Sequence, residues 1–270
     1  MNGSVKDDPI RRLPFFSIIT VVWNNLAGLK QTKETLYQQV CSDWEWIIVD
    51  GASTDGTLEY ALSCSGGRVR VISERDRGIY DAMNKGLLLA EGSYVVFLNS
   101  GDLLAEKESL AKVKDECILR NPDVLFGSSI MDFGLFRIER AVRRTNYIWH
   151  GQPALHQATV FRRDAHAKIL YDLSYTVCGD YDVITRMAHA GLNMQSTPIL
   201  ISVNEFNAGA ESGRKKIKLI MEAARAQRRN LRLSWPLIAV SVLWRTGSSA
   251  MFKLVTWIDL LERKAMRNSP

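Results

Sequence analysis

The 270-residue sequence lacks the glycine-rich motifs of the two most familiar nucleotide-binding folds. No GxGxxG follows its first apolar run and no GxxxxGK(S/T) occurs, which excludes dinucleotide-binding and P-loop proteins. Its four cysteines form no CxxC pair, and no apolar leader lies in residues 1 to 14, so reduced thiols in a cytosolic compartment are expected. The longest apolar run near the C-terminus, Trp235 to Trp244, is shorter than the ~18 residues that span a bilayer.

The positive charge of the chain is concentrated at its C-terminal end. Residues 211 to 270 carry 13 Lys/Arg against 4 Asp/Glu, whereas residues 1 to 210 carry 22 against 25. The net charge of +6 therefore combines a slightly acidic body with a strongly basic tail. The two parts call for separate explanations.

Apolar runs and helical patterns alternate in the N-terminal half. A run rich in β-branched residues is typical of a strand covered on both faces, and apolar residues at helical spacing lie between the runs. Strand, helix and strand repeated with short links predict right-handed crossovers and a mostly parallel sheet, which places the chain in the α/β class. The predicted strands are Phe15 to Trp23, Trp44 to Asp50, Val69 to Ser73 and Tyr94 to Asn99.

Polar residues follow each predicted strand at its carboxyl end. In parallel sheets ligands bind beyond these ends, so the residues there should line one site. An Asp after the second strand can accept a hydrogen bond from a base N–H. An Asp after the fourth can hold Mg²⁺ or Mn²⁺ against a diphosphate. The residues are Asn24, Asp50, Glu74, Asp76 and Asn99 to Asp102.

The pattern loosens after about Glu106. A helix near Lys107 to Arg120 is followed by short strands that predict a small antiparallel element, and Asp180 opens an amphipathic helix. Residues 214 to 266 are expected to be helical with a break near Pro236. We therefore expect a domain over residues 1–213, with 1–14 flexible, and a basic amphipathic helical region over residues 214–270.

Several segments together resemble family 2 glycosyltransferases of the GT-A fold. They are Phe16 to Trp23, Val49 to Thr57, Ser73 to Gly86 and Phe97 to Asp102, the last at the place of that family's DxD motif. Three later segments are similar to bacterial colanic-acid and exopolysaccharide glycosyltransferases. They are Tyr147 to His150, His156-Gln157 and Gly179 to Asp182.

The resemblance implies an inverting transfer of a hexosyl or deoxyhexosyl group from a UDP- or GDP-sugar. Asp50 would recognise the base, Asp102 would hold Mg²⁺ or Mn²⁺, and Asp180 would deprotonate the acceptor hydroxyl. The acceptor would be a saccharide carried on an undecaprenyl-type lipid at the inner face of the plasma membrane. The other donor-side positions are Asn24, Asp76, Arg77, Asn84, Asn99 and Ser100.

The sequence departs from the family pattern in three places. The segment at the DxD position has a single carboxylate, that of Asp102, because Asn99 stands where the family has its first aspartate. Gly51 stands where a second acid often follows Asp50. No QxxRW motif occurs, which favours transfer of one sugar per acceptor over processive polymerisation.

Other interpretations remain open from the sequence alone. Asp180 also suits a helix N-cap, and the thinned DxD motif also suits a noncatalytic sugar-nucleotide-binding or scaffold protein. A nucleotidyltransferase would need a glycine-rich activation loop, which is absent. The basic tail could be a solvated helix or bind nucleic acid, although no nucleic-acid recognition motif accompanies it. Docking on an anionic membrane surface is favoured, because seven Lys/Arg precede a Trp- and Leu-rich stretch.

Overall fold

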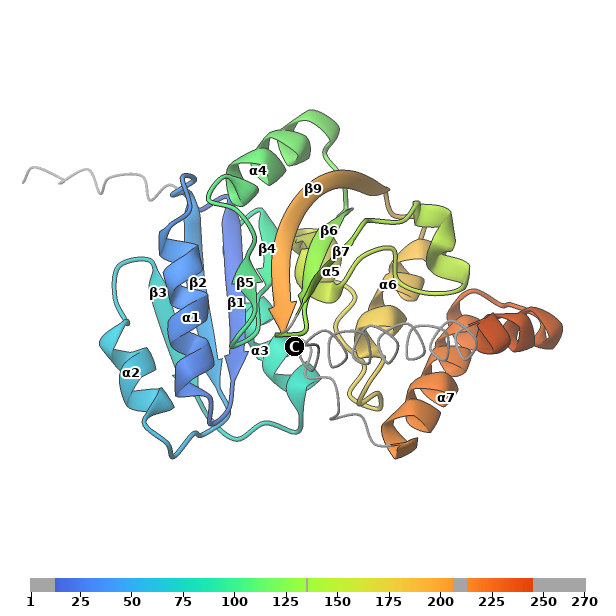
Figure 1. Ribbon diagram of the computed structural model, residues 1–270, viewed down its shortest axis with the longest axis horizontal. Coiled ribbons are helices and arrows are strands. Elements are labelled where there is room, and N and C mark those ends of the chain that lie inside the picture. Colours follow the sequence, from blue (N-terminus) through green and yellow to red (C-terminus); the bar gives the residue numbers. More distant parts are fainter. Residues whose placement is uncertain (1–12, 135, 206–212, 245–270) are drawn as a thin grey trace, which may run out of the picture.

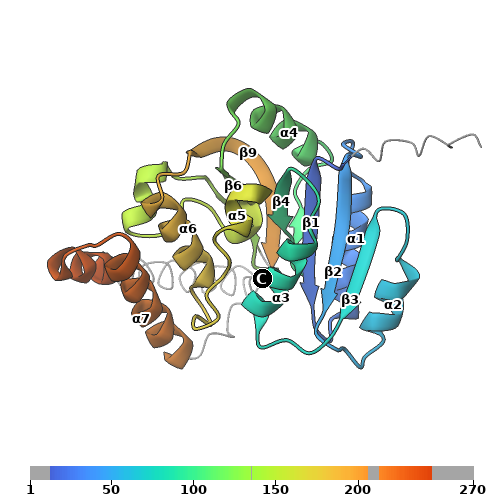
Figure 2. The ribbon, with the colours of Figure 1, turned by 180° about the vertical axis from the view of Figure 1, so that it is seen from behind.

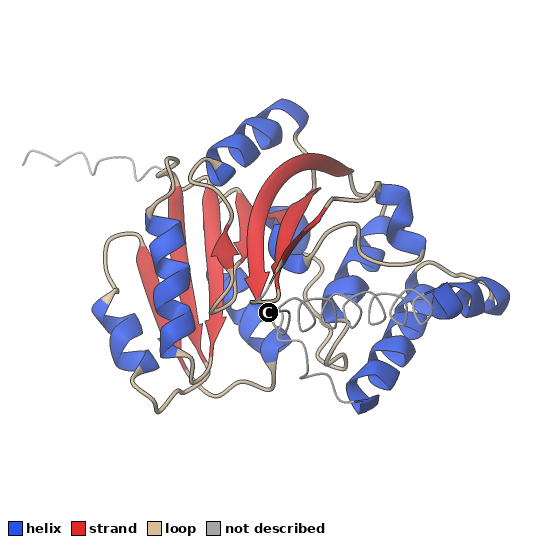
Figure 3. Ribbon diagram, in the orientation of Figure 1, coloured by secondary structure: helices blue, strands red, loops and turns tan. Residues whose placement is uncertain are grey.

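The computed structural model describes residues 13–134, 136–205 and 213–244 (Figure 1). Most of the N-terminal segment expected to be flexible, residues 1–12, and residues 245–270 of the basic region lie outside the described residues. The described chain forms one mixed sheet of nine strands with helices on both faces (Figure 3).

The first half of the sheet is parallel, as the sequence predicts. Its strand order is β3-β2-β1-β4, and all three pairings are parallel. The register places Val22 beside Asp50 and Asp50 beside Ser73, so the carboxyl ends of three strands lie level. The strands are β1 (Phe16–Val22), β2 (Trp44–Asp50), β3 (Val69–Ser73) and β4 (Tyr94–Phe97).

Helices cover both faces of this parallel half, which explains why its central strands are continuously apolar. Every residue of β1 and β2 is buried. Figures 1 and 2 show α1 (Leu26–Tyr37) on one face and α3 (Ile79–Leu89) on the other, with α2 (Thr57–Ser63) beside β3 at the edge. The core is therefore the layer of strand residues between these helices.

The second half of the sheet is largely antiparallel. Beyond β4 the order continues β8-β6-β9-β5, and β7 pairs with β6. β9 is parallel to β6 and curls over the sheet (Figure 1). The segment from His156 begins with the 3₁₀ turn η2 (His156–Ala158), and β8 follows it directly. The strands are β5 (Leu103–Leu104), β6 (Val124–Asp132), β7 (Arg137–Arg140), β8 (Thr159–Arg162) and β9 (Met194–Glu205).

The remaining helices pack around this half. α6 carries Asp180, and α7 lies alongside it (Figures 1 and 2). Residues 235–244 form a further helix after the predicted break. Over the described residues, no helix is both long and apolar enough to cross a membrane. The elements are α4 (Ser109–Arg120), the 3₁₀ helix η1 (Thr145–Trp149), α5 (Arg163–Ala167), α6 (Gly179–His189) and α7 (Gly213–Asn230).

Candidate active site

A cavity of about 790 Å³ lies at the carboxyl ends of the parallel strands. Its walls come from the segments that follow β1, β2 and β3, and from the first turns of α3. This is where the order of the strands predicts a ligand. The polar and glycine residues of its lining are Asn24, Gly51, Thr54, Arg75, Asp76, Gly78 and Asn99.

The segments after β1 and β2 hold each other at the mouth of this cavity. Asn24 has a left-handed backbone (φ 47°), and its Oδ1 accepts a hydrogen bond from the Thr54 N–H at 2.8 Å. The Asn24 N–H donates to Ser53 Oγ at 2.8 Å. The two reciprocal bonds make this part of the wall rigid, and Asn24 lies on the cavity as predicted.

Asp50 is fully buried at the end of β2, and its side chain does not line the cavity. Its Oδ2 accepts from the Ser53 N–H at 3.0 Å and from Ser73 Oγ at 2.6 Å. Its Oδ1 is buried and has no hydrogen-bond partner among the described residues. A buried carboxylate oxygen without a donor costs free energy, so this atom is suited to a donor that arrives with a ligand.

Asp76 supplies a carboxylate that does line the cavity. Its Oδ1 accepts from Lys85 Nζ at 2.6 Å. Its Oδ2 lies beside Gly51, where an added Cβ would be 3.1 Å away. Because Gly51 has no side chain, the carboxylate of Asp76, in the segment after β3, can lie against position 51.

Three other predicted donor-side residues are not brought to the cavity walls. Arg77 is exposed and pairs with Asp81 at 2.9 Å, while Arg75, which the sequence did not single out, lines the cavity. The Asn84 amide bonds to the backbone of Tyr171: its Nδ2 donates to the Tyr171 carbonyl at 3.0 Å, and its Oδ1 accepts from the Tyr171 N–H at 2.9 Å. Ser100 Oγ donates to the Asn25 carbonyl. These side chains fix the framework of the site.

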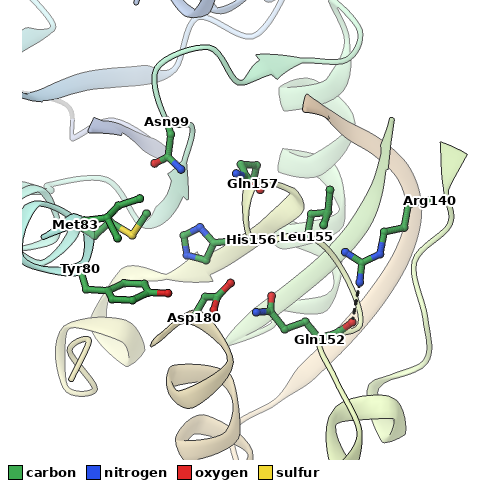
Figure 4. Close-up of a pocket in the computed structure, with 10 residues that line it drawn as sticks. Tyr80, Met83, Asn99, Arg140, Gln152, Leu155, His156, Gln157 and Asp180 are labelled. Carbon is green, nitrogen blue, oxygen red and sulfur yellow. Dashed lines mark hydrogen bonds between the residues drawn. The ribbon is translucent and has the colours of Figure 1, made fainter. Parts of the chain in front are cut away.

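A second, smaller cavity of about 380 Å³ adjoins the first. Ile79 and Asn99 line both, so the two cavities meet at these residues. The Asn99 Oδ1 is buried without a hydrogen-bond partner among the described residues. The smaller cavity is also lined by Tyr80, Met83, Arg140, Gln152, Leu155, His156, Gln157 and Asp180 (Figure 4).

Asp102 lies close to the place where the cavities meet. Its Oδ2 accepts from the Asn99 N–H at 3.1 Å and its Oδ1 accepts from Asn204 Nδ2 at 2.8 Å. Burial raises the pKa of Asp102 to about 6, although hydrogen bonds from Asn204, Gln157 and the Asn99 N–H oppose that rise. A nearby cation would favour the charged form of this carboxylate.

The protein offers few ligands of its own for a metal. Within residues 13–134, 136–205 and 213–244, no three His, Cys, Asp or Glu side chains gather in a metal-binding group. The Asp102 carboxylate and the unpartnered Asn99 Oδ1 are hard oxygen donors of the kind that Mg²⁺ and Mn²⁺ prefer. These residues fit a cation whose other ligands come from a diphosphate and water.

Asp180 lies in the first turn of α6 and faces the smaller cavity. Cys178, and not Asp180, is the N-cap of this helix, and Asp180 Oδ1 accepts from the Tyr181 N–H at 2.8 Å. Burial raises the pKa of Asp180, while the Gln152 amide and the Arg140 charge pull it down. Figure 4 shows its carboxylate between Tyr80 and Gln152. A half-buried carboxylate with a raised pKa suits a general base.

Tyr80 brings α3 against the start of α6. An added Cβ on Gly179 would lie 2.7 Å from the Tyr80 ring, so the residue before Asp180 must be glycine for this approach. The Tyr80 ring also stacks on Tyr171, with centroids 5.4 Å apart. The aromatic pair thereby fixes Asp180 relative to the donor-side helix.

Two buried histidines share the hydroxyl of Tyr171. His156 Nε2 and His166 Nε2 lie 2.7 and 3.2 Å from Tyr171 Oη. Burial lowers the pKa of His156 to about 4 and that of His166 to about 3. Both rings are therefore neutral at pH 7. His156 contributes a polar edge to the smaller cavity without a positive charge.

The family-model comparison decides the class of this protein. A model described as glycosyl transferase family 2 matches residues 17–179. The chain belongs to glycosyl transferase family 2. A relative of this family 2 chain, a "PGL/p-HBAD biosynthesis glycosyltransferase" from Mycobacterium bovis, is 33% identical over 218 residues. The match covers 72% of this chain and 78% of the relative.

Solved structures establish the GT-A fold of this family 2 glycosyltransferase. Staphylococcus aureus TarS 1-349 in complex with UDP-GlcNAc has a TM-score of 0.65 at 16% identity, covering 84% of this chain and 70% of that one. The mannosyltransferase PcManGT from Pyrobaculum calidifontis, in complex with GDP-Man and Mn²⁺, has a TM-score of 0.61 at 17% identity. That match covers 95% of this chain and 83% of PcManGT.

Proposed function

We propose that this glycosyltransferase moves one sugar, with inversion, from a nucleoside-diphosphate sugar to a hydroxyl of a saccharide acceptor. The observation that carries the proposal is the junction of the two cavities at Ile79 and Asn99. The larger cavity suits the nucleoside diphosphate, and the smaller one suits the sugar and the acceptor hydroxyl next to Asp180. The bond to be broken would then lie near Asn99.

The base would bind between the segments that follow β1 and β2. Asp76 presents a carboxylate at the wall, and Asp50 carries the unpartnered Oδ1 at the end of β2. Either oxygen can accept from a ring N–H of uracil or guanine. The affinities of Asp50→Asn and Asp76→Asn for UDP- and GDP-sugars distinguish the two residues. Only the variant of the residue that accepts from the base should lose its selectivity between the two bases.

Asp102 and Asn99 would hold Mg²⁺ or Mn²⁺ against the diphosphate. A cation held there would supply positive charge against the diphosphate as its bond to the sugar breaks. Asp102 already lies in a desolvated position where its charged form gains from a nearby cation. The protein's own part is to orient this carboxylate through Asn204 and the Asn99 N–H.

Asp180 would accept the proton of the acceptor hydroxyl. Among the described residues that line the smaller cavity, Asp180 is the one acid. A single displacement needs one carboxylate as base and no second carboxylate as nucleophile, so this lining favours inversion. The missing QxxRW motif supports transfer of one sugar per acceptor.

The acceptor would belong to exopolysaccharide assembly on a lipid carrier, at the inner face of the plasma membrane. α7 and the following helix support contact with an anionic lipid surface. Lys215 and Lys218 are exposed there, and Trp235 and Trp244 are 65% and 64% exposed. Basic residues near exposed tryptophans suit an interfacial helix on anionic lipid.

A donor panel tests the proposed function. The full chain is incubated with UDP- and GDP-sugars and a mixture of saccharide acceptors, with and without Mn²⁺, and release of nucleoside diphosphate is measured. One donor should be used at least tenfold faster than the rest, and EDTA should suppress the reaction. NMR of the product should show an inverted anomeric centre. Retention of configuration, or no transfer from any donor, would overturn the proposal.

A further inference from the structure

Arg140 places a positive charge at the far end of the smaller cavity. It stands at the end of β7, and Figure 4 shows it beside Gln152, on the opposite side of the cavity from Asn99 and Met83. Asn99 marks the junction with the nucleotide cavity, so Arg140 lies away from the diphosphate. The neutral His156 adds no charge to this lining.

The guanidinium of Arg140 is only partly used by the protein. Its Nη2 donates to the Gln152 carbonyl at 3.2 Å, and no carboxylate of the described chain lies within salt-bridge distance of it. A guanidinium offers five N–H donors. Asp180 is near enough for its charge to be felt but makes no ion pair with Arg140. Most of the donors are thus left for a group that enters the cavity.

A second cation extends this positive charge to the surface. Arg143 is exposed, and its guanidinium lies 4.2 Å from the centroid of the Tyr147 ring. Burial lowers the pKa of Arg140, and the nearby charge of Arg143 lowers it further. Each positive charge near Arg140 makes the approach of an anion more favourable. The arrangement therefore favours a negatively charged ligand.

We infer that Arg140 forms an anion subsite for the acceptor, one that binds a carboxylate or phosphate group next to the accepting hydroxyl. This inference rests on the proposed function, since it takes Asp180 as the place of that hydroxyl. The fork of the guanidinium matches the two oxygens of either anion. The acceptor would then be an acidic sugar or a sugar linked to phosphate, and a neutral glycan would lack the contact.

Matched acceptors test the subsite with the full chain. A glucuronoside is compared with the corresponding glucoside, and a glycosyl phosphate with the corresponding methyl glycoside. The wild type should prefer the anionic member of one pair. Measured on the alkaline plateau of the rate profile, where Asp180 is ionised in both proteins, Arg140→Gln should lose that preference by roughly 10- to 100-fold in kcat/KM, and the rate with the neutral member should fall far less than the rate with the anionic one. Which pair responds tells a carboxylate from a phosphate.

Two further variants and two control measurements complete the test. Arg140→Lys should retain part of the preference, because it keeps the charge but loses the fork. Arg137→Gln, also on β7 but paired with Asp132 at 2.8 Å, should behave as wild type. Thermal melting confirms that all variants fold, and donor affinity should be unchanged throughout.

Binding of the same saccharides, measured by saturation-transfer NMR with nucleoside diphosphate present, keeps the inference testable apart from turnover. If anionic saccharides bind in a way that depends on Arg140 but no sugar is transferred, the result contradicts the proposed function and supports the subsite. Equal binding and turnover of charged and neutral saccharides in the wild type would overturn the subsite, as would a preference that survives in Arg140→Gln.

Discussion

The carboxylate of Glu222 on α7 accepts a hydrogen bond from the backbone N–H of Cys178 at 2.9 Å. It also accepts from the N–H groups of Thr176 and Val177, so three consecutive backbone donors converge on one side chain. Burial opposes ionisation of Glu222, but these backbone donors lower its pKa below the usual range. α7 thus fixes the segment that leads directly into Asp180.

Replacing Glu222 should impair turnover more than donor binding. In Glu222→Ala the three N–H groups lose their acceptor, which should lower the free energy of unfolding by about 2–3 kcal/mol. In the milder Glu222→Gln we expect kcat to fall at least about tenfold, because a misplaced base loses its alignment, with the donor Kd nearly unchanged. Kinetics and calorimetry with the donor check this.

The matched control for Glu222 is Lys218→Gln, an exposed position on the same helix. It should leave kcat and stability unchanged. Hydrogen exchange at residues 176–178 should accelerate in Glu222→Gln and not in the control. A Glu222→Gln enzyme with full kcat and slow exchange there would refute the positioning role.

Gly51 is the second position where a small change should have a defined effect. A Cβ there would lie 3.1 Å from Asp76 Oδ2 and 3.3 Å from Trp23 Cβ, both closer than usual contacts. Gly51→Ala should therefore displace the Asp76 carboxylate and weaken donor binding by about 1–2 kcal/mol, or roughly tenfold in Kd. Titration calorimetry with the preferred donor measures the change.

Ala52→Gly serves as the control for Gly51→Ala. Ala52 has a positive φ of 61°, which glycine adopts without strain, so this variant should keep donor binding and gain up to about 1 kcal/mol of stability. Equal donor affinity in Gly51→Ala and wild type would show that Asp76 and Trp23 yield without consequence for the nucleotide.

The residues at the carboxyl ends of the parallel strands could be predicted because the chain places them locally. Asn24, Asp76 and Asn99 lie within three residues of the ends of β1, β3 and β4, and all three line a cavity. Strand order and parallel register are enough to bring such positions to one rim. The alternation of strands and helices predicted a mostly parallel α/β sheet, and the family resemblance implied the GT-A fold.

The hydrogen-bond partners of individual side chains and the smaller cavity could not be predicted from the local sequence pattern. Asn84 lies in a segment that matches the family, yet its amide binds the backbone of Tyr171, 87 residues away. The sequence pattern does not single out Arg140, because its cavity forms from β7, α3 and α6 together. Such contacts depend on how the antiparallel half folds over the parallel half, which no local period specifies.

The exposed tryptophans of the last described helix should carry membrane binding. Trp235→Ser combined with Trp244→Ser should reduce co-sedimentation with phosphatidylglycerol vesicles severalfold, and high salt should do the same to the wild type. Substitution is preferable to deletion, because Gln227 and Asn230 of α7 are buried and hydrogen-bonded to η1 and α6. Salt-independent binding, or binding equal on neutral phosphatidylcholine vesicles, would contradict the anionic-surface proposal.

The buried histidines should make the fold sensitive to acid. Their folded-state pKa values of about 4 and about 3 lie below the ordinary 6.5, so the unfolded chain takes up protons that the folded chain does not. Above pH 6.5 both histidines are neutral in the folded and in the unfolded chain, so they do not lower the free energy of unfolding. As the pH falls below 6.5, the free energy of unfolding decreases progressively. At pH 5 each histidine should lower the free energy of unfolding by about 2 kcal/mol relative to neutral pH.

Urea unfolding at pH 7.5 and pH 5 measures the histidine effect. His166→Gln should lose less stability between these two pH values than the wild type, whatever its stability at pH 7.5. His189→Gln, at an exposed position on α6, should show the wild-type pH dependence. The same pH dependence in all three proteins would show that His166 titrates equally in both states.

Asp180 gives the sharpest test of the mechanism because its pKa and its role are linked. Asp180→Asn should keep donor affinity and lose about 10²–10⁴-fold in kcat, the usual contribution of a general base.

Since burial raises the pKa of Asp180, kcat/KM of the wild type should fall on acidification at a higher pH than an ordinary carboxylate would give. Gln152→Leu removes a hydrogen bond that lowers this pKa, so its acidic limb should move further up in pH. Asp164→Asn, an exposed acid paired with Arg162, should leave both rate and profile unchanged. Near-normal turnover in Asp180→Asn would remove this residue as the base, and a Gln152→Leu profile that stays in place would separate the acidic limb from Asp180.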